Sequence, residues 1–308
     1  MHNERRIDCC GAIAEALMRR LTITVQGWLL LLPAAVLLGA FTHYPAGATL
    51  WQSFFSTPKG DHATVYIGLD NYRDMLDDPV FWRALANNAW YALGTIPLAI
   101  ALAMAMALWV NRRIAGRPFL RLAFFTPTVL PMIAVANIWL FFYTPGYGLL
   151  DQVLGAFGVP AHNWLGSRET VLACLMVVAV WKEAGFFMIF YLAALQQISP
   201  ILGEAAEIEG AKSWYFFRRV TFPLLMPTTL FVMINAVINA FRLIDHMVVM
   251  TRGGPDNSST LLLYYIFDIG FKYWDTAYAA TLTVVLLGIL AAAALFQFLI
   301  VERRVHYQ

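Results

Sequence analysis

Residues 98–110 read LAIALAMAMALWV, and all thirteen of these side chains are apolar. A surface helix of a soluble protein keeps one polar face, whereas this run has none. The chain has 308 residues, of which 60% are hydrophobic and 13% charged. A soluble domain of this length could not bury so much apolar side chain. The stretch therefore predicts a membrane protein whose solvent is the bilayer.

Six segments are apolar over the roughly 20 residues that a helix needs to cross the hydrocarbon. We expect them at about 25–44, 87–110, 122–144, 170–195, 223–249 and 276–300. A closed β-barrel would show short alternating stretches, which the continuous runs at 29–38 and 98–110 exclude. The predicted fold class is all-α, a polytopic membrane protein with six transmembrane helices. The transmembrane domain would cover residues 25–300, between tails at 1–24 and 301–308.

Lysine and arginine collect in alternate loops. Thirteen lie in the two tails and the loops after the second and fourth spans, and six lie in the other loops. By the positive-inside rule both termini face the cytoplasm. The basic residues follow the topology and so do not indicate nucleic acid. A signal peptide cleaved near Ala46-Gly47-Ala48 is the alternative for the first span, and it would leave five helices.

The loop between the fourth and fifth spans reads GEAAEIEGAKSWYFFRRVTFP from Gly203 to Pro223. Good helix formers from Glu204 to Ile208, then Gly210 and an amphipathic stretch, predict two short helices around a glycine. A phosphate-binding loop is excluded because Ala206 and Ala211 stand where that motif needs glycines. If transport is driven by ATP, the ATPase must be a separate polypeptide.

This loop resembles the EAA loop of ABC-importer permeases, in which Glu-Ala-Ala precedes a glycine and a later proline opens the next span. The matching residues are Glu204, Ala205, Ala206, Gly210 and Pro223. The whole chain is similar to the sugar-permease branch that includes maltose and glycerol-3-phosphate permeases. The supporting marks are IGLDNY at 67–72, Trp181-Lys182, TRGGP at 251–255, and the tail at 301–308.

The resemblance implies the ABC type I importer permease fold in a bacterial inner membrane. The EAA loop, at about 200–222, would be a coupling helix seated in a groove of the ATPase through Glu204, Ala205, Ala206, Glu209 and Gly210. Glu209 replaces the usual Asp and keeps its charge. The implied partners are a second permease subunit, two ATPase subunits, a periplasmic substrate-binding protein and membrane lipid. ATP and Mg would lie on the ATPase, and this chain would bind no cofactor.

Four charged residues fall within the predicted spans, namely Lys182, Glu183, Arg242 and Asp245. Each costs at least ~2.5 to 3.5 kcal/mol to insert, so each needs a partner or water. Arg242 and Asp245 stand at i and i+3, where an ion pair within one helix is available.

A polar stripe in the fifth span favours a functional interpretation. In a continuous helix Asn235, Asn239, Arg242 and His246 fall within an arc of about 60°. The asparagine amides suit hydroxyl groups and Arg242 offers a fork for an anion, so the stripe would line the translocation pathway. An interface with the partner permease would demand the same stripe.

The family resemblance adds contacts after the Trp of the fourth span, at Lys182, Glu183 and Phe186. It adds Thr128 in the Pro127–Pro131 segment of the third span, where the prolines also bend the helix. The predicted substrate-pathway residues are Asn235, Asn239, Arg242, Lys182, Glu183, Phe186 and Thr128. A neutral sugar and an anionic polyol such as a glycerol phosphate both remain open.

The predicted function is the permease subunit of an ATP-driven, binding-protein-dependent importer. An ion-coupled secondary transporter, with Glu183 or Asp245 carrying the proton, is the alternative, but it leaves the EAA loop unexplained. A membrane enzyme would need converging polar groups, whereas the six histidines are scattered without metal-ligand spacing. Neither a metal site nor catalytic residues are therefore expected.

Overall fold

The computed structural model describes residues 22–58, 63–112 and 115–301, and it is helical throughout these ranges apart from loops and one β-bridge between Phe55 and Tyr66. The first helix runs over Thr22–Gln52 and includes α2. The helices from α2 onward are α2 (Tyr44–Gln52), α3 (Asp70–Asp77), α4 (Pro79–Asn111), α5 (Arg117–Val129), α6 (Met132–Phe142), α7 (Leu149–Gly155), α8 (Val171–Gln197), α9 (Pro200–Ile208), α10 (Ser213–Phe216), α11 (Phe222–Leu224), α12 (Met226–Arg242), α13 (Asp245–Met250), α14 (Leu262–Phe267) and α15 (Thr276–Phe296). Turns of π-helix cover Gly39–His43, Phe217–Thr221, Asp268–Lys272 and Gln297–Val301.

Five helices of the described ranges are long and apolar enough to cross a membrane. They are Thr22–Gln52, Pro79–Asn111, Val171–Gln197, Met226–Met250 and Thr276–Leu299, and each overlaps one predicted span. The expected tails at 1–24 and 301–308 lie almost wholly outside the described residues.

The third predicted span, 122–144, is two helices instead of one. Between α5 and α6 the axis turns by 101°. Leu130 has extended backbone, with φ −72° and ψ 136°. Its successor Pro131 disfavours helical backbone at Leu130 and supplies no N–H, so α5 must end there. The prolines break this segment, which is more than the bend that the sequence predicts.

The fifth predicted span is also interrupted. At Leu243 the backbone is extended, with φ −86° and ψ 100°, so α12 ends at Arg242 and α13 starts at Asp245. The predicted i, i+3 ion pair is wrong, because Arg242 and Asp245 are not joined by any ion pair among the described residues. The break also takes His246 off the arc that the sequence predicts.

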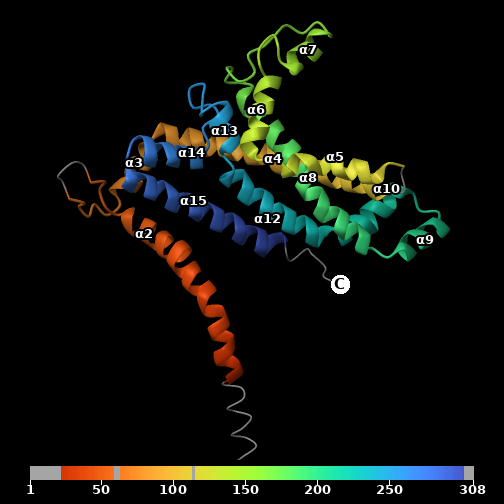
Figure 1. Ribbon diagram of the computed structural model, residues 1–308, viewed down its shortest axis with the longest axis horizontal. Coiled ribbons are helices and arrows are strands. Elements are labelled where there is room, and N and C mark those ends of the chain that lie inside the picture. Colours follow the sequence, from red (N-terminus) through yellow and green to blue (C-terminus); the bar gives the residue numbers. More distant parts are fainter. Residues whose placement is uncertain (1–21, 59–62, 113–114, 302–308) are drawn as a thin grey trace, which may run out of the picture.

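The centre of the molecule is the pair α4 and α8, which lie against each other in Figure 1. Ala99, Ala103 and Ala107 of α4 are fully buried, together with Ala184 and Phe187 of α8. Small side chains let the two backbones approach closely, which favours helix association in lipid. The helices α5 and α12 pack beside this pair. Together the four helices position the polar groups of the interior.

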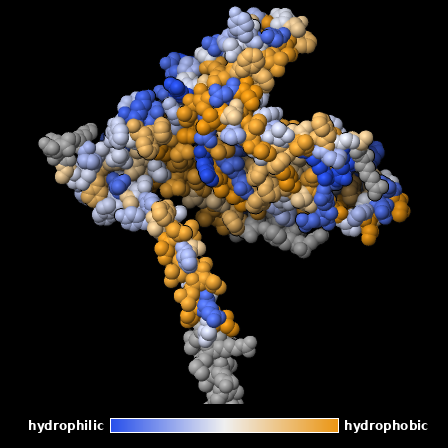
Figure 2. All heavy atoms as spheres, in the orientation of Figure 1, coloured by the Kyte–Doolittle hydropathy of each residue, from blue (hydrophilic) through white to orange (hydrophobic). Residues whose placement is uncertain are grey.

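Most of the first helix projects away from this body, and only its last part, α2, packs against α15 (Figure 1). In its most apolar window no residue is buried, and Trp28 and Leu30 are 66% and 83% exposed. Figure 2 shows that most of the visible surface of this helix is apolar. Lipid or another membrane protein must therefore surround it.

Candidate functional site

A cavity of about 120 Å³ with a mostly apolar surface lies where the two helix breaks meet. Side chains of α4, α5, α6, α8, α12 and α13 reach it, although these helices are far apart in sequence. Non-helical backbone at membrane depth is tolerated where it is buried in protein or lines an aqueous cavity. The polar lining residues are Tyr91, Thr128, Lys182, Glu183, Asn239 and His246, and the apolar ones are Met132, Ala179, Phe186 and Leu243.

Lys182 closes the break between α5 and α6. Its ammonium group donates to the backbone carbonyls of Pro127 at 3.1 Å and Thr128 at 3.4 Å, and also to that of Leu130. These carbonyls have lost their helical N–H partners at the end of α5. An ammonium group has three donors, so all three are taken by backbone.

Glu183 supplies a carboxylate to the cavity. Asn239, from the last turn of α12, lines the same cavity. Among the described residues no Lys, Arg or His lies within ion-pair distance of Glu183. The carboxylate therefore keeps acceptor capacity for another group in the cavity.

Tyr91 and His246 form a buried pair on another side of the cavity. The Tyr91 hydroxyl lies 3.0 Å from Nε2 of His246, and both side chains are almost fully buried. The other ring nitrogen, Nδ1 of His246, has no partner among the described residues, and neither does the buried Oγ1 of Thr128. Buried polar groups are normally hydrogen-bonded, so these two shielded atoms are exceptions in the interior.

A second functional element lies at the far end of α8. The helix α9 has no buried residue, and the side chains of Ile201 and Ile208 are 70% and 87% exposed. Gly210 adopts φ +68°, its N–H donates to the Glu207 carbonyl, and that of Ala211 donates to Ala206. This is a Schellman helix end, which a residue with a Cβ would strain.

The predicted coupling residues all belong to this element. Glu204, Ala205, Glu209 and Gly210 are exposed, and Ala206 is partly buried. Beneath α9, a hollow of about 510 Å³ opens between the ends of α4 and α8 and the start of α10. The exposed isoleucines and the glycine end make α9 a candidate surface for a protein partner.

Comparison with known proteins agrees with this architecture. Residues 96–307 match the family described as the inner membrane component of binding-protein-dependent transport systems. The chain belongs to this family. It is accordingly a transport subunit, of the ABC-importer permease kind, and not an enzyme.

Similar proteins carry more specific names. The permease is 33% identical to the sulfoquinovosyl glycerol transport system permease protein SmoG of Agrobacterium fabrum, over 85% of each chain. It is 30% identical to the sn-glycerol-3-phosphate transport system permease protein UgpA of the same organism, over 91% of this chain and 96% of that one. A crystal structure of a bacterial ABC transporter involved in alginate import contains a chain with the same fold, with TM-score 0.82 and 22% identity over 93% of this permease and 98% of that chain.

The permease brings five of the seven predicted pathway residues to one cavity. These are Thr128, Lys182, Glu183, Phe186 and Asn239. The other two do not line it: Arg242 belongs to the end of α12 outside the cavity, and the Asn235 amide donates to the Phe231 carbonyl of its own helix.

Tyr91 and Met132 line the cavity although the sequence pointed to neither, and His246, a member of the predicted polar stripe, lines it as well. The hydroxyl of Tyr91 inside an apolar span was a signal that it needs a partner. The sequence could not indicate that this partner lies 155 positions away.

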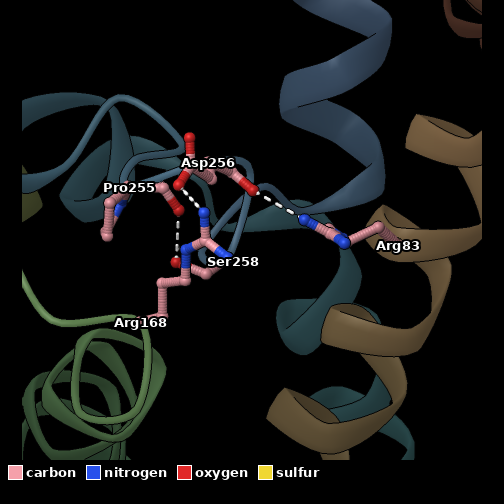
Figure 3. A network of polar contacts seen from close by, with 5 residues as sticks. All are labelled: Arg83, Arg168, Pro255, Asp256 and Ser258. Carbon is pink, nitrogen blue, oxygen red and sulfur yellow. Dashed lines mark hydrogen bonds and ion pairs between the residues drawn. The ribbon is translucent and has the colours of Figure 1, made fainter.

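At the end of α4 remote from α9, the loop before α14 is fixed by polar contacts (Figure 3). Arg168 forms an ion pair with Asp256, and Arg83 of α4 donates to the Asp256 carbonyl at 2.9 Å. Arg252, Asp256 and Asn257 all have positive φ. Asp and Asn adopt this left-handed backbone readily, so of the three only Arg252 is unusual there, and together these contacts define the rim at this end of the molecule.

The neighbouring loop of the permease depends on Asp151. Hydrogen bonds from the Gly146 amide and the Trp164 indole hold the pKa of Asp151 below its usual value. A lowered carboxyl pKa stabilises the fold above the ordinary carboxyl range, and this contribution is lost as pH falls through the lowered pKa. The loop around α7 is therefore built around a carboxylate.

Proposed function

We propose that this permease forms half of the translocation pathway of an ATP-driven importer and that a second permease subunit forms the other half. Two ATPase subunits would hydrolyse ATP and hold its Mg, and a periplasmic binding protein would deliver the substrate. Both termini would lie in the cytoplasm, as the distribution of Lys and Arg indicates. Metal sites and cofactors have no part in the proposal for this chain.

The observation that carries the proposal is the connection of an exposed helix, α9, to an internal cavity that Lys182 and Glu183 of α8 line. Both elements belong to one continuous segment, since α8 ends at Gln197 and α9 begins at Pro200. A movement of α9 would therefore be transmitted along α8 to Lys182 and Glu183. This connection supports alternating access, in which closure of the ATPases re-orients the two permeases.

We infer that the substrate is a sugar, a polyol or a glycerol-phosphate-like compound. Both relatives named above carry the word glycerol in their substrates' names. In the cavity, Asn239 and Glu183 offer the hydrogen-bonding groups that hydroxyl-rich compounds need. Residues of the partner permease would complete the pathway, of which this chain would form half.

The test is substrate-stimulated ATP hydrolysis by the complex reconstituted with ATPase, partner permease and binding protein. We expect Gly210→Val to reduce the stimulated rate at least tenfold, because a β-branched residue is strained at φ +68° and α9 would lose its end. Glu204→Ala should reduce it less, because it removes one exposed carboxylate and leaves the helix intact.

Gly288→Ala is the control. Gly288 lies in α15 and not in α9, and an added Cβ would meet nothing within 4 Å, so stimulated hydrolysis should be unchanged. All variants are first checked for normal membrane insertion and assembly. Uptake that continues at the wild-type rate without the ATPase would show that the proposed function is wrong.

A further inference from the structure

We propose that a basic hollow beside α10 binds the phosphate headgroup of an anionic phospholipid. The hollow has a volume of about 610 Å³ and is lined by Trp214, Tyr215, Arg218, Arg219 and Pro223. Binding sites for small molecules commonly measure about 300 to 1,000 Å³. The basic hollow shares no residue with the interior cavity or with α9, so it goes beyond the proposed transport function. On the proposed orientation it belongs to the cytoplasmic leaflet.

Both arginines of the basic hollow are free to bind an anion. Arg218 and Arg219 are exposed, and neither forms a hydrogen bond or ion pair with any residue that the structure describes. The residues that line the hollow include no acidic side chain. A guanidinium group stays charged in proteins and carries five N–H donors in a planar fork that matches phosphate oxygens. Two such forks therefore open into one hollow.

Tyr215 positions one of these groups. The guanidinium carbon of Arg219 lies 5.9 Å from the centre of the Tyr215 ring, which stands four positions earlier in the chain. A cation within about 6 Å of an aromatic ring is attracted to the ring face. The contact holds the guanidinium at the hollow but supplies no oxygen to its N–H groups, which stay available to a phosphate.

The basic hollow lies at the level of lipid headgroups. Arg218 and Arg219 precede Pro223, where the apolar run of this span begins, by five and four residues. The chain is helical here and a helix rises 1.5 Å per residue, so this separation is about 6 to 8 Å. The headgroup layer on each side of the hydrocarbon has a similar depth, roughly 5 to 8 Å. The two charges therefore lie level with the phosphates of the membrane.

Exposed aromatic and apolar side chains surround the two arginines. Trp214 and Tyr215 are 70% and 60% exposed, and Phe222 and Pro223 are exposed as well. Trp and Tyr are enriched where lipid headgroups meet hydrocarbon. A free phosphate ion makes no use of these side chains, whereas a phospholipid carries both a phosphate and hydrocarbon. The occupant that fits the whole hollow is therefore the lipid.

An ATPase subunit fits the basic hollow less well, because α10 is packed against the membrane helices. Phe217, directly after α10, packs against the core formed by α4 and α8. Trp214 and Phe216 line the hollow at the ends of these two helices. By contrast, α9 has no buried residue. A soluble partner would meet α9, and the basic hollow stays beside the membrane.

The occupant is identified by photocrosslinking from within the hollow. The photoreactive p-benzoylphenylalanine takes the place of Trp214, which lines the hollow, and keeps an aromatic side chain there. The complete complex is placed in vesicles of phosphatidylcholine with a minor share of phosphatidylglycerol and irradiated, and the adducts are identified by mass. We expect phosphatidylglycerol to be enriched among the lipid adducts about fivefold over its share of the vesicle, because basic residues at the surface favour anionic lipid.

The charges are tested by removing them. Arg218→Gln combined with Arg219→Gln should abolish the enrichment, and Arg218→Lys with Arg219→Lys should retain most of it. Lys212→Gln is the matched control, because Lys212 is an exposed cation of the same loop that does not line the hollow. Each variant is first checked for membrane insertion and assembly. Adducts that match the composition of the vesicle, or an enrichment that survives the double Gln variant, would overturn the proposal.

Further outcomes of the same experiment exclude other occupants. Inorganic phosphate, added at constant ionic strength, should leave the lipid adducts unchanged, and their loss would mean that the hollow holds a free phosphate. Adducts with the ATPase in place of lipid would assign the surface to that subunit and refute the lipid site. The measurement needs neither ATP nor the transported substrate, so its failure would leave the proposed function standing.

Discussion

The two helix breaks that line the cavity are stabilised in different ways. At the break between α5 and α6, the charged Lys182 takes the carbonyls of Pro127, Thr128 and Leu130. At the break after α12, the neutral side chain of Asn88 takes the Ala240 carbonyl at 3.2 Å. The same Asn88 accepts from the Leu262 N–H at the start of α14. One break uses a charge and the other uses an amide.

The difference explains where the charge of the cavity comes from. A cation inside the membrane needs a compensating anion nearby, and Glu183 is the next residue along α8. A neutral amide needs no compensating anion. Among the described residues at the second break, no charged side chain lines the cavity. The break between α5 and α6, which Lys182 closes, therefore brings a carboxylate to the cavity. The break after α12, which Asn88 closes, adds no charge to the cavity.

Of the substitutions that test this difference between the two breaks, Lys182→Met should have the largest effect. It leaves three carbonyls without a donor and Glu183 without a neighbouring cation. We expect a loss of about 4 kcal/mol in the free energy of unfolding, because contacts to a charged group and buried unpaired groups are each worth about 1 to 3 kcal/mol. Denaturant unfolding of the purified chain in detergent measures it. Lys182→Arg keeps the charge and should lose less; an equal loss would mean that the charge is not what stabilises the break.

Gly185→Ala tests how tightly the first break is pressed against α8. An added Cβ would overlap the backbone carbonyl of Phe124 and lie 3.2 Å from Oγ1 of Thr128. Because backbone cannot rotate away as a side chain can, we expect a loss of about 3 kcal/mol. The same unfolding measurement applies. Gly288→Ala in α15, where a Cβ would meet nothing within 4 Å, is the control and should be neutral.

Asn88→Leu removes the amide that closes the second break. Two buried backbone groups then lose their partner, so we expect a loss of about 2 kcal/mol in the free energy of unfolding, less than for Lys182→Met or Gly185→Ala. The neighbouring Asn87 also donates to two carbonyls, those of Asn257 and Thr260, but its side chain is less buried. We expect Asn87→Leu to cost less than about 1 kcal/mol, since water can replace those bonds. If Asn88→Leu were more damaging than Lys182→Met, the contrast between the two breaks would be lost.

Much of the fold could be predicted because its signals are local. Continuous apolar runs indicated five spans, and the order of helix formers and Gly210 indicated the helix end after α9. The break at Leu243 could not be predicted, because neither proline nor glycine marks it. The stripe from Asn235 was therefore extended to His246 across a helix that does not continue.

The site was predictable only in part, because its partners are distant in sequence. Lys182 and Glu183 stood out as charges in an apolar span. The carbonyls that engage Lys182 lie 52 to 55 positions away, and they became available only because the backbone turns sharply at Leu130. Without that turn, Lys182 would have had donors to offer an anion, as the sequence suggested.

The length of α4 has a further consequence. Its 33 residues extend for about 50 Å at 1.5 Å per residue, whereas the hydrocarbon of a bilayer is about 30 Å thick. Unless α4 is strongly tilted, roughly two fifths of it must project beyond the lipid tails. Arg83, near its start, and the exposed pair of Arg168 with Asp256 would then lie in water. Dissolved ions would weaken the attraction within that exposed pair but would hardly affect the interior Lys182. A rise in ionic strength would therefore loosen the rim and leave the interior unchanged.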